Sequence, residues 1–331
     1  MTNQHGDPLD EVRSFMKSRV ILTAAQLDLF TLLDRNPSSA QTLAQTTKAD
    51  LRALTRVLDC LVTFGHLTKT DDIYALTDKG ALFSQDHPDS VLPMVLHLAH
   101  IWQNWHHLTE TVCRATSPHR QSVVHSGSEA LTAFIGAMHV VGKNLARDIA
   151  ASLNLSPFKQ LLDIGGASGT YTIAFLERQP SLRAVIYDLP EVLPMAQKRL
   201  EAHGLLNRVR LVAGDFYKDP LPTGCDLALL SAIIHQNSPE ENLALYRKIH
   251  DVLKPGGCLL IRDHIMEPDR THPPAGALFA INMLVNTQGG DTYTFEETKA
   301  ALQEAGFRTV AWLRKGPQMD CLVQAFVSDH A

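Results

Sequence analysis

The chain has 331 residues, a hydrophobic content of 45% and a formal net charge of −5, which is typical of a globular protein large enough for two domains. Its mixed charges give no general attraction to nucleic acid or to an anionic membrane. The sequence starts without a basic segment followed by an apolar one, and no apolar run approaches the roughly 20 residues that a membrane span needs. We therefore expect a cytoplasmic protein with no nucleic-acid or membrane partner.

The five cysteines are far apart in the sequence, and no two of them form a CxxC pair. An odd number at wide spacing argues against a disulfide framework and against a zinc cluster. We expect free thiols in a reducing compartment and no bound metal.

The first 85 residues predict short helices followed by a β-hairpin. Apolar residues recur at helical spacing, the Ser38-Ser39 pair can cap a helix, and Gly65 can end one. We expect helices over Asp10–Leu33, Ala40–Thr46 and Asp50–Phe64, and strands over His66–Lys69 and Ile73–Leu76. Three helices and a β-wing are the pattern of a winged helix.

A mostly helical stretch follows from about Val91 to Leu155, and its most loop-like part is Ser117–Ser128. Histidines and tryptophans are dense between His97 and His107. Histidines three or four residues apart share a helix face and could bind a metal, but no acidic residue joins them at helical spacing. A helix packed against its neighbour is the leading interpretation, and the wall of a substrate pocket is the other.

From Gln160 onward, strand candidates alternate with helix candidates, which predicts a parallel sheet covered by helices on both faces. The last two strand candidates flank a Gly316-Pro317 turn, so we expect them to pair antiparallel at an edge. The strand candidates are Leu161–Ile164, Ala184–Tyr187, Val209–Val212, Leu227–Ser231, Cys258–Asp263, Thr309–Leu313 and Cys321–Val327. The helix candidates between them are Thr170–Arg178, Glu191–His203 and Glu240–Leu253.

Acidic residues follow three successive strand candidates. Asp163–Gly169 leads from a strand into a glycine-rich turn, where the backbone can approach a ligand closely, although the spacing is not that of a dinucleotide site. Asp188 ends the next strand, where an acid can accept from two ribose hydroxyls. Asp215 follows the third, where a carboxylate can accept from an adenine amino group while Phe216 packs on the base. Each acid alone could be a turn or cap residue, but together they predict one ligand crevice.

With these segments the chain resembles the class I S-adenosylmethionine-dependent O-methyltransferases of the plant caffeate/hydroxyindole type, which have many bacterial members. The likeness covers nearly the whole chain. The matching segments are Leu22–Ala25, Leu27–Phe30, Gly65–Thr77, Asp163–Gly169, Asp188–Pro190, Gly214–Phe216, Lys254–Gly257, Gly289–Gly290 and Ala305–Phe307. The resemblance implies an α/β fold, with a winged-helix dimerisation domain at 1–90 and a helical connector at 91–155 that contributes to the acceptor pocket. At 156–331 it implies a Rossmann-like domain, whose mostly parallel seven-stranded sheet has an antiparallel edge strand.

The resemblance also implies the partners and the site residues. S-adenosylmethionine is the implied cofactor, a small aromatic hydroxyl compound the implied acceptor, and a homodimer through the N-terminal domain the implied assembly. The cofactor-binding residues would be Asp163, Gly165, Gly166, Gly169, Asp188, Leu189, Asp215, Phe216 and Ser231. The acceptor-binding residues would be Trp102, Phe134, Met138, Asn282 and Met283.

His235 follows the fourth strand candidate and Asp263 ends the fifth, so imidazole and carboxylate could meet at the sheet edge that faces the cofactor. Imidazole is mostly neutral at pH 7 and can take the proton of a phenol. Complete prior transfer from a phenol would cost roughly 5 kcal/mol, so we expect proton loss to accompany in-line methyl transfer. In the resembling family the matching residues are the general base and its supporting acid; a structural strand-end histidine is the alternative.

The chain departs from the family pattern at three places. His235-Gln236-Asn237 stands where the family usually has His-Asp-Trp, Thr292 falls near a second acid that flanks the base, and Ala167 replaces the middle glycine of the loop. The first two departures bear on base activation and on the substrate.

Three other hypotheses remain open from the sequence. One keeps the cofactor but takes a carbon, nitrogen or sulfur acceptor. Another is a winged-helix, ligand-binding transcription regulator without catalysis, which the balanced charges of the first 80 residues disfavour. The third is a nicotinamide-dependent dehydrogenase, which the glycine spacing disfavours.

Overall fold

A computed structural model describes residues 7–115 and 127–328 of the chain. Within these residues the chain divides into two compact units, one drawn from 7–102 and 127–140 and the other from 103–115 and 141–328. The division falls within two long helices, α6 (Leu92–His106) and α8 (Ser128–Ser152). The expected loop at Ser117–Ser128 lies almost wholly outside the described residues.

The N-terminal helical run is broken into α1 (Pro8–Gln26) and α2 (Leu29–Arg35). The expectation of one helix over Asp10–Leu33 is therefore wrong, because Asp28 adopts a left-handed conformation with φ of 55°. The apolar spacing hides this break, since Leu29, directly after the turn, is fully buried, and Ala24 and Ala25 before the turn are buried as well. Aspartate is one of the few residues that enter this conformation readily.

The rest of the first unit follows the predicted order. Ser39 caps α3 by accepting from the backbone N–H of Thr42, and Asp50 caps α4 by accepting from that of Ala53. The hairpin is confirmed, and a short third strand extends it in the order β1-β3-β2. The elements are β1 (Ser38–Ser39), α3 (Ala40–Thr47), α4 (Leu51–Thr63), β2 (Leu67–Thr70), β3 (Ile73–Leu76) and α5 (Asp78–Ala81).

The second unit contains a seven-stranded sheet in the order β11-β12-β8-β7-β4-β5-β6. Its strands are β4 (Gln160–Ile164), β5 (Arg183–Asp188), β6 (Val209–Ala213), β7 (Cys225–Ser231), β8 (Leu253–Asp263), β11 (Arg308–Arg314) and β12 (Cys321–Phe326). The strands from β8 to β6 are parallel, whereas β12 pairs antiparallel with both β8 and β11. All seven predicted strands and the antiparallel pairing at one edge are confirmed.

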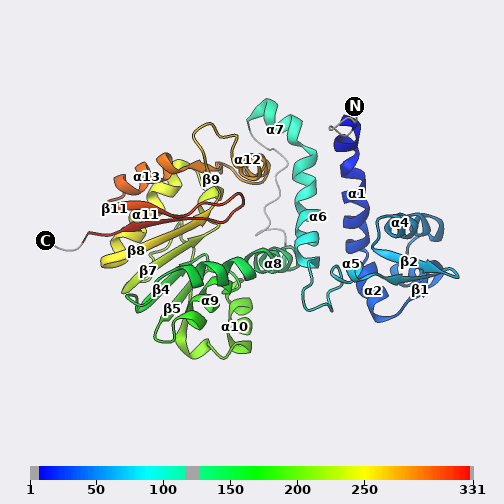
Figure 1. Cartoon of the computed structure of the whole chain (residues 1–331), viewed down its shortest axis with the longest axis horizontal. Helices are drawn as coiled ribbons and strands as arrows, with labels where there is room; N and C mark the ends of the chain where they lie inside the picture. Colours follow the sequence, from blue (N-terminus) through cyan, green and yellow to red (C-terminus); the bar gives the residue numbers. More distant parts are fainter. Residues whose placement is uncertain (1–6, 116–126, 329–331) are drawn as a thin grey trace, which may run out of the picture. The chain divides into compact units, whose positions relative to one another are not determined.

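Helices cover both faces of this sheet (Figure 1). On one face lie α9 (Thr170–Arg178), α10 (Leu193–Ala202) and the end of α8, and on the other lie α11 (Pro239–Val252) and α13 (Phe295–Glu304). Strands covered on both faces read as nearly continuous apolar runs, which is why they were visible in the sequence. The strand order reverses at β4, the place where open α/β sheets bind ligands.

Several elements of the second unit were not predicted. The helix α12 (Pro274–Asn286) and the two-stranded parallel sheet of β9 (Ile265–Met266) and β10 (Tyr293–Thr294) lie beyond the carboxyl end of β8. The remaining elements are α7 (Leu108–Arg114) and the 3₁₀ turns η2 (Leu206–Arg208) and η3 (Ile234–Gln236). Both α12 and η3 contribute residues to the candidate site.

Candidate active site

The glycine-rich loop after β4 is closely packed. A Cβ on Gly165, whose φ is 65°, would lie 2.6 Å from Ile233 Cδ1 and 3.6 Å from Phe216 Cε1. A Cβ on Gly166 would lie 2.9 Å from Asp163 Cγ. A Cβ would push aside the Ile233 methyl and the Asp163 carboxyl group, and the positive φ of Gly165 disfavours any other residue there. Backbone atoms rather than side chains therefore form this part of the predicted ligand site. The loop therefore fits a ligand held against backbone atoms.

Asp163 holds the loop from below. Its side chain is 1% exposed, and its Oδ2 accepts from Thr172 Oγ1 of α9 at 2.6 Å. Burial raises the pKa of Asp163 to about 6, and the charge of Asp188 adds to this effect. Because the carboxylate is enclosed, Asp163 supports the glycine loop from within the core and has no oxygen exposed to a ligand.

Asp188, at the end of β5, is fixed by two backbone donors. Its Oδ2 accepts from Ala167 N and its Oδ1 from Leu189 N, both at 2.7 Å. Burial raises its pKa, although these two hydrogen bonds oppose the effect. Each oxygen keeps a further lone pair, so the carboxylate can still accept from two hydroxyl groups. Ala167, which stands in place of the middle glycine of the loop, adopts a left-handed backbone conformation with a φ of 48°.

Asp215 and Phe216 follow β6, the strand next to β5. Asp215 Oδ1 accepts from Tyr217 N at 2.9 Å, and its Oδ2 pairs with Lys218 Nζ at 3.0 Å. Burial would raise the pKa of Asp215, but the hydrogen bond and charge of Lys218 outweigh it and lower the pKa. Phe216 lies against the glycine loop. The structure therefore brings together the loop, Asp188 and Phe216 at one end of the sheet.

His235 and Asp263 form a buried pair at the same end of the sheet. His235 lies in η3 directly after β7, and Asp263 is the last residue of β8. His235 Nδ1 lies 2.8 Å from Asp263 Oδ1 and 3.0 Å from Oδ2, and the two residues are 9% and 0% exposed. Burial would raise the pKa of Asp263, but the charge of His235 and its hydrogen bond outweigh burial and lower it.

The hydrogen bonds of this pair determine its tautomer. An ionised carboxylate only accepts hydrogen bonds, so His235 Nδ1 carries a hydrogen and donates it in a hydrogen bond to Asp263. Asp263 Oδ1 also accepts from His264 N at 2.8 Å, which fixes the carboxylate. His235 Nε2 is left with a lone pair, and Phe279 of α12 stands edge-on to the ring at 4.9 Å. The arrangement is that of a base held by a buried acid.

Asn282 and Met283 lie on α12, like Phe279. Asn282 Oδ1 accepts from Trp105 Nε1 and from Asn286 Nδ2, both at 2.9 Å. The amide is therefore held with its Nδ2 as the free polar group. Met283 is 6% exposed and belongs to the core.

The other predicted acceptor residues, Trp102, Phe134 and Met138, lie in the first unit and are half-buried. Phe134 packs on His97 with ring centres 5.2 Å apart, and burial lowers the pKa of His97 to about 4, so its imidazole is neutral. Across residues 7–115 and 127–328, no group of three or more His, Cys, Asp or Glu side chains could hold a metal ion. The contact with Phe134 agrees with helix packing.

The comparisons with known proteins agree with this geometry. The O-methyltransferase domain model matches residues 105–308, and the O-methyltransferase dimerisation domain model matches residues 9–86. The chain belongs to the O-methyltransferase family. The expected S-adenosylmethionine-dependent O-methyltransferase is thereby confirmed.

Similar proteins span more than nine-tenths of this chain. The tetracenomycin polyketide synthesis 8-O-methyl transferase TcmO of Streptomyces glaucescens is 30% identical over 92% of this chain and 92% of its own. The 3-hydroxy-5-methyl-1-naphthoate 3-O-methyltransferase of Streptomyces sahachiroi is 29% identical over 92% and 90%. The solved structure of the mitomycin 7-O-methyltransferase MmcR has a TM-score of 0.85 at 27% identity, covering 96% of each chain.

The departures from the family pattern have local explanations in this O-methyltransferase. Asn237 is fully buried: its Oδ1 accepts from Tyr217 Oη, and its Nδ2 donates to Asn242 Oδ1 at 3.0 Å. Gln236 Nε2 donates to the same tyrosine oxygen at 3.3 Å. Thr292 is 2% exposed, and its hydroxyl donates to Gly276 O of α12 at 3.4 Å. Asp263 is thus the carboxylate that contacts His235 among the described residues.

Two features of the site were missed. Phe279 lies in a helix that was not predicted, and Arg262, 6% exposed, looks like an ordinary strand residue in the sequence. Arg262 Nε donates to Ser231 Oγ at 3.0 Å, so the predicted cofactor residue Ser231 is joined to a buried cation. A charged residue within an apolar strand was the available signal for Arg262.

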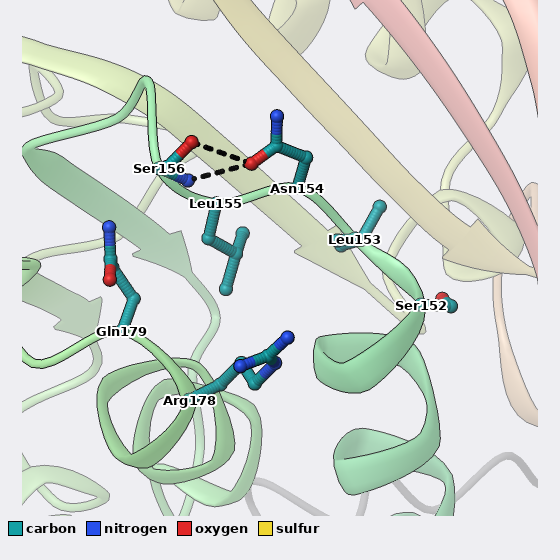
Figure 2. Close-up of a pocket in the computed structure, with 7 residues that line it drawn as sticks. All are labelled: Ser152, Leu153, Asn154, Leu155, Ser156, Arg178 and Gln179. Carbon is teal, nitrogen blue, oxygen red and sulfur yellow. Dashed lines mark hydrogen bonds between the residues drawn. The ribbon is translucent and has the colours of Figure 1, made fainter.

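The O-methyltransferase also has a hollow of about 320 Å³ near the ends of α8 and α9, lined by Ser152, Leu153, Asn154, Leu155, Ser156, Arg178 and Gln179 (Figure 2). It lies where β4 begins, at the opposite end of the sheet from His235. Asn154 Oδ1, which accepts from Ser156 N and Oγ, closes its own turn there. Because open α/β sheets bind ligands at the carboxyl ends of their strands, we place the active site at the other end.

No helix among residues 7–115 and 127–328 has the length and apolarity to cross a bilayer.

Proposed function

We propose that this O-methyltransferase methylates a hydroxyl group of a small aromatic compound and that His235 is the general base. The observation that carries the proposal is the His235–Asp263 pair, which leaves Nε2 with a lone pair beside Phe279. The names of the relatives, one of which acts on a hydroxynaphthoate, support an aromatic hydroxyl acceptor.

Bound S-adenosylmethionine supplies an activated methyl group. Asp188 would accept from its ribose hydroxyls, Asp215 and Phe216 would bind its adenine, and the backbone of Gly165, Gly166 and Gly169 would lie against it. Leu189 and Ser231 would complete the wall, and Asp163 would hold the loop through Thr172. The packed glycines and the half-buried carboxylates fit such a ligand.

His235 would take the acceptor proton at Nε2. The hydroxyl of a phenol has a pKa near 10 and that of a free imidazole is near 6.5, so a complete transfer before reaction would cost about 5 kcal/mol. The proton therefore moves as the hydroxyl oxygen attacks. As the imidazole becomes positive, the buried Asp263 carboxylate stabilises it and keeps Nδ1–H in place. Phe279 restricts the approach of water to the ring.

The acceptor wall would combine Phe279 and Asn282 of α12 with Met283 behind them. Trp102, Phe134 and Met138 are further candidates from the resemblance. Asn282 would offer its free Nδ2–H to an oxygen of the acceptor, because Trp105 and Asn286 occupy its Oδ1.

We also propose that the chain forms a homodimer through its dimerisation domain, residues 1–90, and binds the cofactor with residues 156–331. Residues 91–155 would be a helical connector between these two domains that contributes to the acceptor pocket. The dimerisation domain model covers 9–86, and α1 exposes an apolar stripe at helical spacing formed by Leu9, Val12, Phe15 and Met16, each at least half exposed. Burying such a stripe between two chains is favourable. The five free cysteines support a cytoplasmic location.

The experiment that tests the proposal screens phenols, catechols and hydroxylated polycycles with labelled S-adenosylmethionine, for the wild type and His235→Ala. We expect turnover of a phenolic acceptor and a loss of about 10² or more in the variant, with unchanged affinity for S-adenosylhomocysteine. Transfer to carbon, nitrogen or sulfur, or near-normal turnover of the variant, would contradict it.

A further inference from the structure

Arg262, the residue before Asp263 in β8, is a buried cation that forms no ion pair with a described residue. It is 6% exposed, and its nitrogens have no carboxylate partner within ion-pairing distance in the part of the chain that the structure describes. Its neighbour Asp263 faces the other side of the sheet, as strand alternation requires, and pairs with His235. The nearby Arg314, in contrast, pairs with Asp320 at 3.2 Å.

Polar contacts hold the Arg262 side chain in place. Its Nε donates to Ser231 Oγ at 3.0 Å and its Nη1 to Met319 O at 2.8 Å, and Cζ lies 5.1 Å from the centre of the Tyr171 ring. Nη2 donates to none of the described residues and is not fully enclosed. A buried guanidinium normally finds an anion, so the free N–H groups mark a prepared position for one.

This position adjoins the candidate cofactor crevice. Arg262 is the register partner of Ser231 at the carboxyl end of β7. Tyr171 is the second residue of α9, which begins directly after the glycine loop. The guanidinium is thus placed between the tip of β7 and the start of α9, on the face of the sheet that also holds Asp163.

We propose that Arg262 is the binding site for a carboxylate group in the methyl-transfer site. Resting on the cofactor site proposed above, the favoured source is the carboxylate of the amino-acid part of S-adenosylmethionine; a carboxylate on the acceptor has the same chemistry. Guanidinium binds carboxylate with charge-assisted, directional hydrogen bonds. Ser231 and Met319 would orient it so that Nη2 meets the ligand.

The test compares two pairs of ligands by calorimetry. The first pair is S-adenosylhomocysteine and its decarboxylated analogue. The second pair, measured with saturating S-adenosylhomocysteine, is a hydroxynaphthoate and its carboxamide. The proteins are the wild type, Arg262→Met and the control Arg208→Met, which removes a cation that donates to three backbone carbonyls at the other end of the sheet.

We expect the wild type and Arg208→Met to bind S-adenosylhomocysteine at least about tenfold tighter than the decarboxylated analogue, and Arg262→Met to lose most of this preference. If Arg262→Met instead loses only the preference for the hydroxynaphthoate over its carboxamide, Arg262 binds a carboxylate of the acceptor. A wild type without preference in either pair, or a folded Arg262→Met that keeps both preferences, would overturn the proposal.

A wild type that binds no member of the first pair would instead refute the proposed cofactor site. If Arg262→Met fails to unfold cooperatively, Arg262→Gln and Arg262→Lys replace it, and Lys should keep part of the preference. If none folds, the arginine Nε–H spectrum of the wild type decides, because a resonance that responds equally to both members of each pair contradicts the subsite.

Discussion

Replacing Asp263 with Asn tests the proposed base most directly. The substitution keeps the size of the side chain but removes the charge that faces His235 Nδ1 at 2.8 Å. Two unit charges about 4 Å apart attract by about 4 kcal/mol at an effective dielectric constant near 20. The transition state carries only part of the imidazolium charge, so about 3–4 kcal/mol is at stake, which is a fall in kcat of roughly 10²–10³.

The assay measures kcat and KM with a phenolic acceptor, together with the affinity for S-adenosylhomocysteine. Asp226→Asn is the control, because its carboxylate also accepts from backbone N–H groups, those of Lys159 and Gln160, but at the other end of the sheet. We expect Asp226→Asn to keep its kcat and Asp263→Asn to keep its cofactor affinity. A kcat of Asp263→Asn within about threefold of the wild type would refute the reasoning.

Three further predictions concern single residues. Gly165→Ala should lose at least about tenfold in S-adenosylhomocysteine affinity by calorimetry, since its Cβ would meet Ile233 at 2.6 Å and φ is positive; unchanged affinity would count against the proposed loop. Phe15→Glu should shift sedimentation from dimer towards monomer, because it charges the exposed α1 stripe; an unaltered dimer would place the interface elsewhere. His66 is 2% exposed, and neither ring nitrogen has a hydrogen-bond partner among the described residues. Burial lowers the pKa of His66, and the positive charges of Lys79 and Lys17 lower it further. The unfolded chain therefore binds the proton more readily, and stability should fall as pH drops below about 6.5; His66→Leu should flatten this decline in denaturant melts, and an identical slope would contradict it.

The sheet could be predicted because its physics is local. Parallel strands buried on both faces are continuous apolar runs, and Asp188 and Asp215 mark where two of them end. The break at Asp28 could not be predicted, since Leu29 continues the apolar spacing after a backbone reversal. The helix α12 could not be predicted because its own sequence is apolar nearly throughout, so no alternation of apolar and polar residues at helical spacing marks it.

The sequence predicts which strand ends carry the site residues, but it does not predict the hydrogen bonds that their side chains form. Strand order places His235 and Asp263 together, and the sequence reveals that order. The sequence does not reveal which way a carboxylate turns: Asp163 is committed to Thr172, while Asp188 remains half-buried with free lone pairs. The sequence shows Arg262 only as a charge within an apolar strand. That it forms no ion pair with a described residue can be seen only from its neighbours in three dimensions.

The departures at Gln236, Asn237 and Thr292 leave the proposed base with a single acid. Thr292 offers a neutral hydroxyl that is bonded to α12, and Asn237 is tied to Tyr217 and Asn242. Neither can balance an imidazolium charge, so Asp263 is the one carboxylate among the described residues that would stabilise the proposed base during proton transfer. A base with one buried acid depends on that acid more strongly than a base flanked by two, which is why the charge of Asp263, rather than its shape, should control the rate.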